Sequence, residues 1–418
     1  MAIVIIGIAI LFFLGHGLSW FFEKTKIPDL LILVALGYFL GPVFGIINAE
    51  DLGKVGGVVA TTALIVILYE GGLHLSARDL LTSSLPAFGL TIVGFGLIVT
   101  CGALVGWGIA LKPLPISMLL GVGIGSTSSA IVIPMVKQLS ISDNTKTILG
   151  LESAFTDVLT IVIFLVLVDS FASGQFSAQE LIVGIGPKTV IAGLMGIFSG
   201  FVWAYIKRKY SRLVSMAFAG EAWALLTYGL IEAMKHNGAI GVLTLGFMLA
   251  NLDLLPTWLK NQVSNVAVSY KDMSLLSEIT YILRTFFFLY LGLLIQFSNW
   301  KIVIIALIIS ILVFVTRYIA IWLLYSPQKY SRLDAMVSTA MGPRGLACAV
   351  LATIPLQRGI EEGQWLQNVL FAVIPITITF TAIFVALSEN ASFRNKMEKL
   401  FHKYPNAALQ PTVPNVEK

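Results

Sequence analysis

Long apolar segments separated by short polar loops occupy almost the whole chain. A membrane-spanning helix needs roughly 20 mainly apolar residues, and this pattern predicts about thirteen such helices. They fall near residues 3–22, 29–47, 57–75, 86–111, 115–138, 146–170, 188–206, 213–235, 239–251, 275–297, 301–325, 333–354 and 365–387. No barrel-like alternation is visible, and only helices or closed barrels satisfy the backbone within a bilayer. The pattern therefore predicts an all-α polytopic membrane protein.

Composition excludes several classes of protein. Of the 418 residues, 57% are hydrophobic and 12% are charged, whereas a soluble domain carries about 25% charge, so a soluble globular enzyme is excluded. The formal net charge of +5 is small for this length, and the basic domain needed for nucleic-acid binding is absent. Cys101 and Cys348 lie in apolar runs, which excludes a disulfide framework. The first segment lacks the features of a cleaved secretory signal, so we expect it to remain as a helix.

The lysine and arginine residues predict an orientation. If the amino terminus lies outside, 18 of the 27 basic residues fall in inside loops and the tail, and 6 fall in outside loops. Positive charge concentrates on the cytoplasmic side of membrane proteins. We therefore expect an outside amino terminus and a cytoplasmic carboxyl terminus in the cell (inner or plasma) membrane. The three remaining basic residues, Arg284, Arg317 and Arg344, lie within apolar segments.

The sixth segment carries two carboxylates and three hydroxyls in an otherwise apolar helix, from Glu152 and Ser153 through Thr156, Asp157 and Thr160. An ionisable group at mid-bilayer costs about 2.5–3.5 kcal/mol, so it normally faces a partner or a water-filled cavity. Ser153 and Asp157 stack on one helix face, and Glu152 and Thr156 stack on the adjoining face. Packing contacts alone are an alternative, but they explain two acids at this depth poorly. Asp157 is therefore the predicted primary functional residue.

Two further segments are interrupted by glycine, hydroxyl residues or proline. One runs from Gly121 through the Ser126–Ser129 hydroxyl run to Pro134, and the other is Ser338–Gly345. They hold the fifth position in each of two six-helix halves, segments 1–6 and 8–13, which the seventh segment joins. Close helix packing explains small residues in either segment alone. The symmetric pair instead predicts inverted six-helix repeats with a transport site at the midplane.

The chain resembles the monovalent cation:proton antiporter family, in the branch that contains bacterial and archaeal sodium/proton antiporters and the animal exchangers. Four stretches carry the resemblance: Ile27-Pro28 through Gly37 to Gly41-Pro42, Tyr69–Leu73, Glu152–Asp157 and Gly342–Gly345. The resemblance implies thirteen helices, crossed discontinuous fifth and twelfth helices, and a homodimer in the lipid bilayer. It also implies a transmembrane domain over 1–387, in which core helices (about 86–170 and 301–387) move against scaffold and dimerisation helices (about 3–75 and 188–297). Residues 388–418 are polar and basic, and we expect a short, flexible cytoplasmic tail.

The resemblance also assigns roles to single residues. It makes Asp157 the carboxylate that binds the cation and the proton. Further oxygens at or beside the ion would come from Glu152, Ser153, Thr156, Thr127 and Ser128, with sodium or potassium itself at Asp157, Ser153 and Thr127. Arg317 matches the arginine that neutralises the glutamate, and Arg344 is the second choice of partner for Glu152. No cofactor is expected.

Two positions depart from the family pattern. Thr156-Asp157 stands where this branch usually has Asn-Asp, and Thr127-Ser128-Ser129 stands where the fifth helix usually has Thr-Asp-Pro. The site therefore has one carboxylate fewer, which leaves the ion selectivity and the pH profile open. Hard alkali cations take oxygen ligands, so the class of transported ion is unchanged.

These residues predict a secondary antiporter, not an enzyme. With Glu152 held by Arg317, one unpaired acid remains at Asp157, so one proton would exchange electroneutrally for one cation and serve pH homeostasis. Sodium, with lithium, is the first expectation and potassium the alternative. A cation channel is disfavoured because neither a charged ring nor a filter motif is visible. A membrane hydrolase is disfavoured because no nucleophile-elbow sequence is present.

Overall fold

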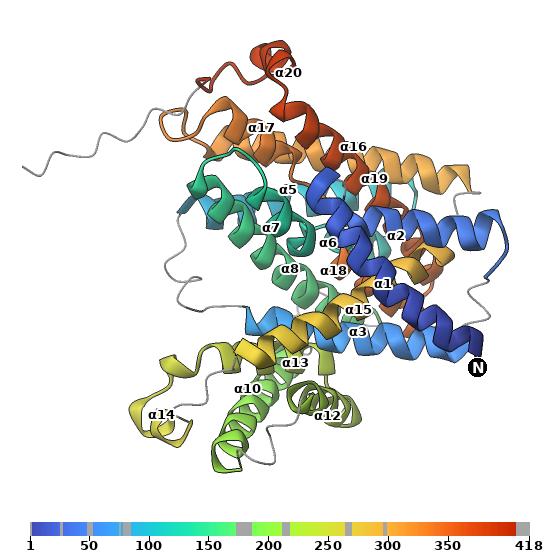
Figure 1. Ribbon diagram of the computed structural model, residues 1–418, viewed down its shortest axis with the longest axis vertical. Coiled ribbons are helices and arrows are strands. Elements are labelled where there is room, and N and C mark those ends of the chain that lie inside the picture. The colour runs from blue at the N-terminus through green and yellow to red at the C-terminus, as the bar shows by residue number, and fades with distance from the viewer. Residues whose placement is uncertain are drawn as a thin grey trace, which may run out of the picture.

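The computed structural model describes residues 2–25, 28–47, 53–74, 77, 85–172, 186–210, 218–263, 270–295 and 299–406. Within these ranges the regular structure is helical throughout, so the predicted all-α class is confirmed (Figure 1). The α-helices are α1 (Ala2–Thr25), α2 (Asp29–Tyr38), α3 (Gly53–Leu73), α5 (Leu85–Leu104), α6 (Leu114–Gly123), α7 (Ser129–Lys137), α8 (Asp143–Ala172), α10 (Gly186–Lys209), α12 (Ala219–Ala233), α13 (Gly238–Ala250), α14 (Thr257–Val263), α15 (Tyr270–Leu294), α16 (Trp300–Leu324), α17 (Arg332–Ala340), α18 (Leu346–Gln357), α19 (Gly363–Glu389) and α20 (Ala391–Lys396).

Six of the described helices are long and apolar enough to cross a membrane, and five shorter apolar helices accompany them. The helices overlap the segments predicted from sequence, with boundary shifts of a few residues. The helix expected over 275–297 begins at Tyr270. The helix expected over 213–235 begins at Ala219, and residues 211–217 lie outside the described part of the chain. The number of membrane crossings stays a prediction.

Both segments that were predicted to be interrupted are broken in the structure. The fifth predicted segment divides into α6 and α7 around residues 124–128, and the twelfth divides into α17 and α18 around residues 341–345. Gly345 shows why the second break needs glycine, because a Cβ atom there would overlap the Ser128 side chain. The two breaks therefore come close enough for backbone and side chain to touch.

Helices far apart in sequence pack closely through glycine. A Cβ atom on Gly37 of α2 would lie 3.0 Å from the Gly292 Cα atom of α15, and it would overlap the Leu289 carbonyl. Likewise, a Cβ atom on Gly72 of α3 would lie 2.9 Å from the Gly246 Cα atom of α13. Small residues allow such close backbone approach in membrane proteins. These contacts join the first and second halves of the chain.

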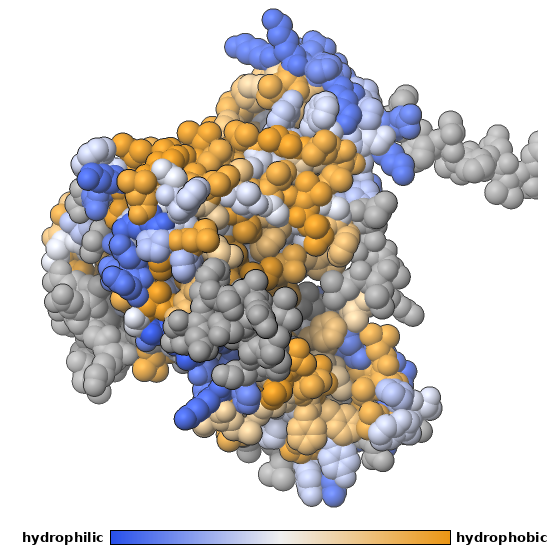
Figure 2. Space-filling view, turned by 180° about the vertical axis from the view of Figure 1, so that it is seen from behind, coloured by the Kyte–Doolittle hydropathy of each residue, from blue (hydrophilic) through white to orange (hydrophobic). Residues whose placement is uncertain are grey.

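The exterior of the protein is largely apolar. Figure 2 shows broad hydrophobic areas over the bundle, and hydrophilic residues both at the end that carries α20 and in separate clusters lower on the same face. Large apolar side chains such as Phe13, Trp107 and Phe198 are more than half exposed. An apolar surface of this extent is what a helical protein presents to lipid.

The first part of the tail is folded, so the expectation of flexibility over residues 388–418 is wrong for residues 391–406. Phe401 and Tyr404 are buried, and the Tyr404 hydroxyl donates a hydrogen bond to the Ile321 carbonyl at 3.0 Å. The Arg332 N–H donates to the Pro405 carbonyl at 2.7 Å. Two aromatic residues thus anchor this segment against the ends of α16 and α17. Residues 407–418 lie outside the described residues.

Candidate ion-binding site

The site forms where the two helix breaks meet. The Ser128 N–H donates to the Pro343 carbonyl at 2.9 Å, which joins the α6–α7 break to the α17–α18 break. A helix end leaves backbone donors or acceptors without partners inside the helix. Bringing two breaks together therefore concentrates free backbone groups and half-helix dipoles in the protein interior.

Arg344 satisfies backbone carbonyls at this crossing. Its guanidinium is buried and donates through Nη1 to the Gly125 carbonyl at 3.1 Å and to the Ser126 carbonyl. Both carbonyls follow the carboxyl end of α6, where a positive charge is favourable. The sequence named Arg344 as the second choice of partner for Glu152, but the structure places it on the backbone of the α6–α7 break. It therefore shapes the break that carries Ser126.

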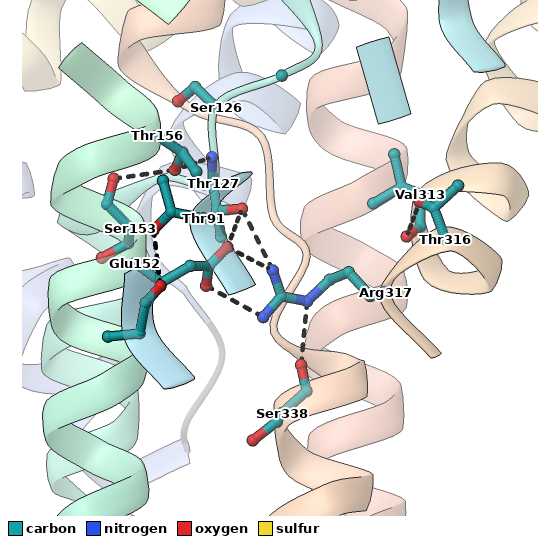
Figure 3. Close-up of polar contacts among 12 residues, drawn as sticks. Thr91, Ser126, Thr127, Glu152, Ser153, Thr156, Val313, Thr316, Arg317 and Ser338 are labelled. Carbon is teal, nitrogen blue, oxygen red and sulfur yellow. Dashed lines mark hydrogen bonds and ion pairs between the residues drawn. The ribbon is translucent and has the colours of Figure 1, made fainter. Parts of the chain in front are cut away.

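Glu152 forms a bidentate ion pair with Arg317 (Figure 3). Nη1 lies 2.8 Å from Oε1, and Nη2 lies 3.2 Å from Oε2. Thr127 donates its hydroxyl to Oε1 at 3.3 Å, and the Arg317 Nε–H donates to the Ser338 carbonyl at 3.0 Å. Glu152 is 2% exposed and Arg317 is 5% exposed. A buried carboxylate requires such a partner, so this charge is neutralised within the protein.

Asp157 is held by serine hydroxyls. Ser126 donates its hydroxyl to Oδ1, while Ser129 donates its hydroxyl to Oδ2 at 2.6 Å and its backbone N–H to the same atom at 3.3 Å. Among the described lysine, arginine and histidine side chains, none forms an ion pair with Asp157. Asp157 as a residue is partly exposed, whereas Glu152 is buried. Asp157 is thus a partly exposed carboxylate that accepts hydrogen bonds from two serines and has no counterion among the described side chains.

The other predicted site residues lie beside this centre. Ser153 donates its hydroxyl to the Gly150 carbonyl at 2.9 Å within α8. Thr156 donates to the Ser153 carbonyl at 3.1 Å and accepts the Thr127 N–H at 3.1 Å. Ser128 lies at the crossing through its backbone. The structure therefore gathers all the predicted residues within one polar region, but Ser153, Thr156, Thr127 and Ser128 make no hydrogen bond to Asp157.

Ser126 and Ser129 are the contacts that the predicted set omitted. Ser129 is the first residue of α7 and Ser126 lies in the break before it. Free N–H groups and small hydroxyl residues at the start of a helix favour a nearby anion. The hydroxyl run after Gly125 carried this signal, although sequence alone does not show which of its members face α8.

On α7 and α8, a stripe of exposed residues lies along one face of each helix and on one side of Asp157 only. Partly or fully exposed positions run along both helices toward Asp157, at Lys137, Ile133 and Ser129 on α7 and at Asp143, Thr147, Gly150 and Ala154 on α8. The helices are adjacent there, because a Cβ atom on Gly150 would lie 4.0 Å from Ile133 Cγ1. Beyond Asp157 the same face of α8 is buried at Thr160, Phe164 and Val168. Asp157 therefore lies at the inner end of an exposed stripe that begins at Lys137 and Asp143.

An all-helical membrane protein with two broken helices crossing beside a buried polar site belongs to the class of secondary transporters. The comparisons make this class more specific. The transmembrane sodium/hydrogen exchanger family matches residues 8–387. The chain belongs to this family, which consists of transporters and not enzymes, and the resemblance seen in the sequence is confirmed.

Relatives with named activities support the same family. The K(+)/H(+) antiporter NhaP of Alkalimonas amylolytica is 24% identical over 396 residues, covering 90% of this chain and 65% of that protein. The K(+)/H(+) antiporter NhaP2 of Shewanella sp. (strain ANA-3) is 27% identical over 374 residues, covering 85% of this chain and 61% of that protein. The Na(+)/H(+) antiporter ApNhaP of Aphanothece halophytica is 27% identical over 240 residues, covering 56% of this chain and 44% of that protein. The chain spans less than two thirds of the length of these relatives.

The fold has a solved counterpart. The structure of the sodium proton antiporter MjNhaP1 from Methanocaldococcus jannaschii at pH 8 matches with a TM-score of 0.71 and 20% sequence identity. The match covers 92% of this chain and 99% of the other. It shows that the two chains share a polytopic fold.

Proposed function

We propose that the protein exchanges a monovalent cation for protons by alternating access, with Asp157 as the carboxylate that binds each in turn. One observation carries this proposal: Asp157 is partly exposed and forms no ion pair with any described basic side chain, whereas Glu152 on the same helix is buried and paired with Arg317. A fixed ion pair cannot release its charge to a transported ion. Asp157 can bind either a cation or a proton, because both compete for the same negative charge.

The stoichiometry follows from the charges that would cross the membrane. Moving an unpaired charge through a low-dielectric barrier is far costlier than moving a neutral site. Asp157 becomes neutral when it holds one monovalent cation or one proton, and the Glu152–Arg317 pair adds no net charge. The proposed exchange is therefore one proton for one cation, without net charge movement.

The identity of the cation divides the proposal into two candidates. Sodium, with lithium, is the first, and MjNhaP1 and ApNhaP are named for sodium. Potassium is equally open, because NhaP and NhaP2 are named for potassium. Oxygen ligands from hydroxyls and one carboxylate suit both ions.

The packing of the helices supports inverted repeats. If segments 1–6 repeat as segments 8–13, then α2 corresponds to α13 and α3 corresponds to α15. The observed packing of α2 on α15 has its counterpart in α3 on α13, and each pair meets at two glycines. The contacts of α7 with α8 similarly match those of α18 with α19. Both pairs of contacts are expected from a two-fold relation between the halves.

The exposure pattern supports an inward-facing state. In the proposed orientation, Lys137 and Asp143 lie at the cytoplasmic end, where the exposed stripe that leads to Asp157 begins. At the other end, polar contacts join the proposed core helices to the scaffold helices. Arg358 Nη2 lies 3.4 Å from Glu232 Oε2, and the Asn237 amide donates to Asp169 Oδ2 at 3.2 Å. These contacts tie the two groups of helices together beside a cavity that Glu232, Asn237 and Arg358 help to line, and they would have to open for outward release.

The remaining parts of the proposal concern assembly and location. We expect a homodimer formed through the scaffold helices in the cell membrane, with the amino terminus outside. Broad apolar surface is available for both lipid and a second copy. The segment at residues 391–406 would lie on the cytoplasmic side, where its basic residues are favourable.

Purified protein in proteoliposomes tests the activity. An outward cation gradient should drive proton uptake, and comparison of sodium, lithium and potassium at several pH values identifies the cation. An imposed membrane potential should leave the rate unchanged. A rate that follows the potential contradicts one-for-one exchange, and unitary currents in electrophysiology would replace the antiporter proposal with a channel.

A further inference from the structure

We infer that the hydroxyl oxygens of Ser126 and Ser129 are ligands of the transported cation, and that Ser129 contributes to the affinity for it. This inference rests on the proposed role of Asp157 and adds the residues that complete its site. It replaces the hydroxyls expected from sequence, Ser153 and Thr127, with those of Ser126 in the α6–α7 break and Ser129 in α7.

Each of the two serines contacts a different oxygen of the Asp157 carboxylate. Ser126 contacts Oδ1 and Ser129 contacts Oδ2, so one hydroxyl lies beside each carboxylate oxygen. The carbonyl of Ser126 is fixed by Arg344, and Ser129 is fixed as the first residue of α7. A cation that approaches Asp157 therefore finds two more oxygen atoms already in place.

A hydroxyl can serve the carboxylate and a cation at once. It carries one hydrogen and two lone pairs, so a serine that donates to Asp157 keeps lone pairs for a hard cation. Alkali cations prefer such oxygen ligands. The hydroxyls of Ser153 and Thr127 are instead directed to the Gly150 carbonyl and to Glu152.

Exposure distinguishes Ser129 from its neighbours. Ser126, Thr127, Glu152, Ser153 and Thr156 are all buried, each at 2% exposure or less. Ser129 and Asp157 are the members of this polar group that are partly exposed. Ser129 and the carboxylate that it contacts thus lie together on the partly exposed side of this polar group.

The position of Ser129 allows its two donors to be separated experimentally. Proline is well tolerated at the first position of a helix, where its φ angle fits and its missing N–H costs no intrahelical bond. Ser128 has φ −61° and ψ 109°, which lies outside the α region that a following proline disfavours. Ser129→Pro therefore removes both the hydroxyl and the N–H while keeping the backbone, whereas Ser129→Ala removes the hydroxyl alone and Ser129→Thr keeps both.

The test is cation-driven proton flux in proteoliposomes for these three variants and Ser126→Ala. Loss of one ligand should raise the KM for the cation by about tenfold with little change in the maximal rate. Ser129→Ala and Ser129→Pro should show the same increase, and Ser129→Thr should restore a KM near that of the parent. The ratio of the KM values for sodium and potassium should also change in Ser129→Ala. Ser388→Ala is the matched control, because this buried serine donates only to its own helix at the Phe384 carbonyl.

Three outcomes overturn the inference. First, the KM of Ser129→Ala for the cation can stay unchanged. Second, this KM can fall, which would show that the hydroxyl competes with the cation for Asp157. Third, the KM can rise in Ser129→Pro alone, which would assign the effect to the backbone N–H. Asp157→Asn in the same vesicles separates this failure from that of the proposed function. If Asp157→Asn is inactive while Ser129→Ala is normal, only the ligand assignment fails. If Asp157→Asn still exchanges cations for protons, the proposed site itself is wrong.

Discussion

Glu152 and Asp157 are two carboxylates on one helix, five residues apart, in opposite environments. Glu152 is 2% exposed and fixed by two hydrogen bonds from Arg317. Asp157 is partly exposed and held by neutral donors from Ser126 and Ser129. The two residues are separated by only about 7.5 Å along the helix axis. The role of an acid in a membrane helix therefore depends on the partner that other helices supply, and not on its position in the helix alone.

The largest effect is expected at Asp157. Asp157→Asn removes the negative charge that binds either ion, so cation-dependent proton flux should fall at least about 100-fold while the protein stays folded. Flux in proteoliposomes and size-exclusion chromatography measure the two properties. Asp143→Asn is the matched control, because Asp143 lies on the same helix with a side chain that is 98% exposed. Normal exchange in Asp157→Asn would remove the contrast between the two acids.

The second largest effect is expected at the Glu152–Arg317 ion pair. Arg317→Ala leaves Glu152 buried without its partner, which should destabilise the protein by about 3–5 kcal/mol. Thermal unfolding in detergent measures this loss. The double variant Glu152→Gln with Arg317→Gln removes both charges and should recover most of the stability, because a neutral buried pair carries no uncompensated charge. Equal stability of Arg317→Ala and the parent would show that this pair is not the structural one.

The smallest effect is expected at the Glu232–Arg358 ion pair, between the proposed core and scaffold. Glu232 and Arg358 are partly exposed, and such pairs contribute about 0–1 kcal/mol. Glu232→Gln should therefore change the exchange rate by less than about fivefold, by weakening one contact between the proposed core and scaffold. Lys112→Gln is the control, because the Lys112–Glu362 pair at 2.8 Å joins two elements of the proposed core. An equal change in both variants would mean that neither pair controls opening.

Much of the site could be predicted from sequence because its main signals are local. Two acids in an apolar helix, breaks marked by glycine and proline, and arginines within apolar segments each stand out against the hydrophobic background. The burial of Arg317 beside Glu152 matches what the resemblance implied. The class of the fold follows from the length and spacing of the apolar segments.

The hydroxyl partners of Asp157 could not be predicted in the same way. Helical spacing places Ser153 on the same face as Asp157, yet Ser153 donates to a carbonyl of its own helix, as short hydroxyl side chains often do. The actual donors come from a different segment, and its rotation against α8 is a tertiary property. The partners of Arg344 also differ from the predicted partner Glu152. Its charge alone does not show that it donates to the backbone carbonyls at a helix break. In the tail, the overall polarity concealed the two aromatic anchors, Phe401 and Tyr404.

In the proposed exchange Asp157 holds a proton and a cation alternately, so cation binding should release a proton that can be measured. Sodium, lithium or potassium is added to purified protein in weakly buffered detergent solution, and the released protons are counted against bound cations. We predict one proton released for each cation bound at pH values where Asp157 is protonated, and none from Asp157→Asn. Cation binding without proton release, or equal release from Asp157→Asn, would contradict the account.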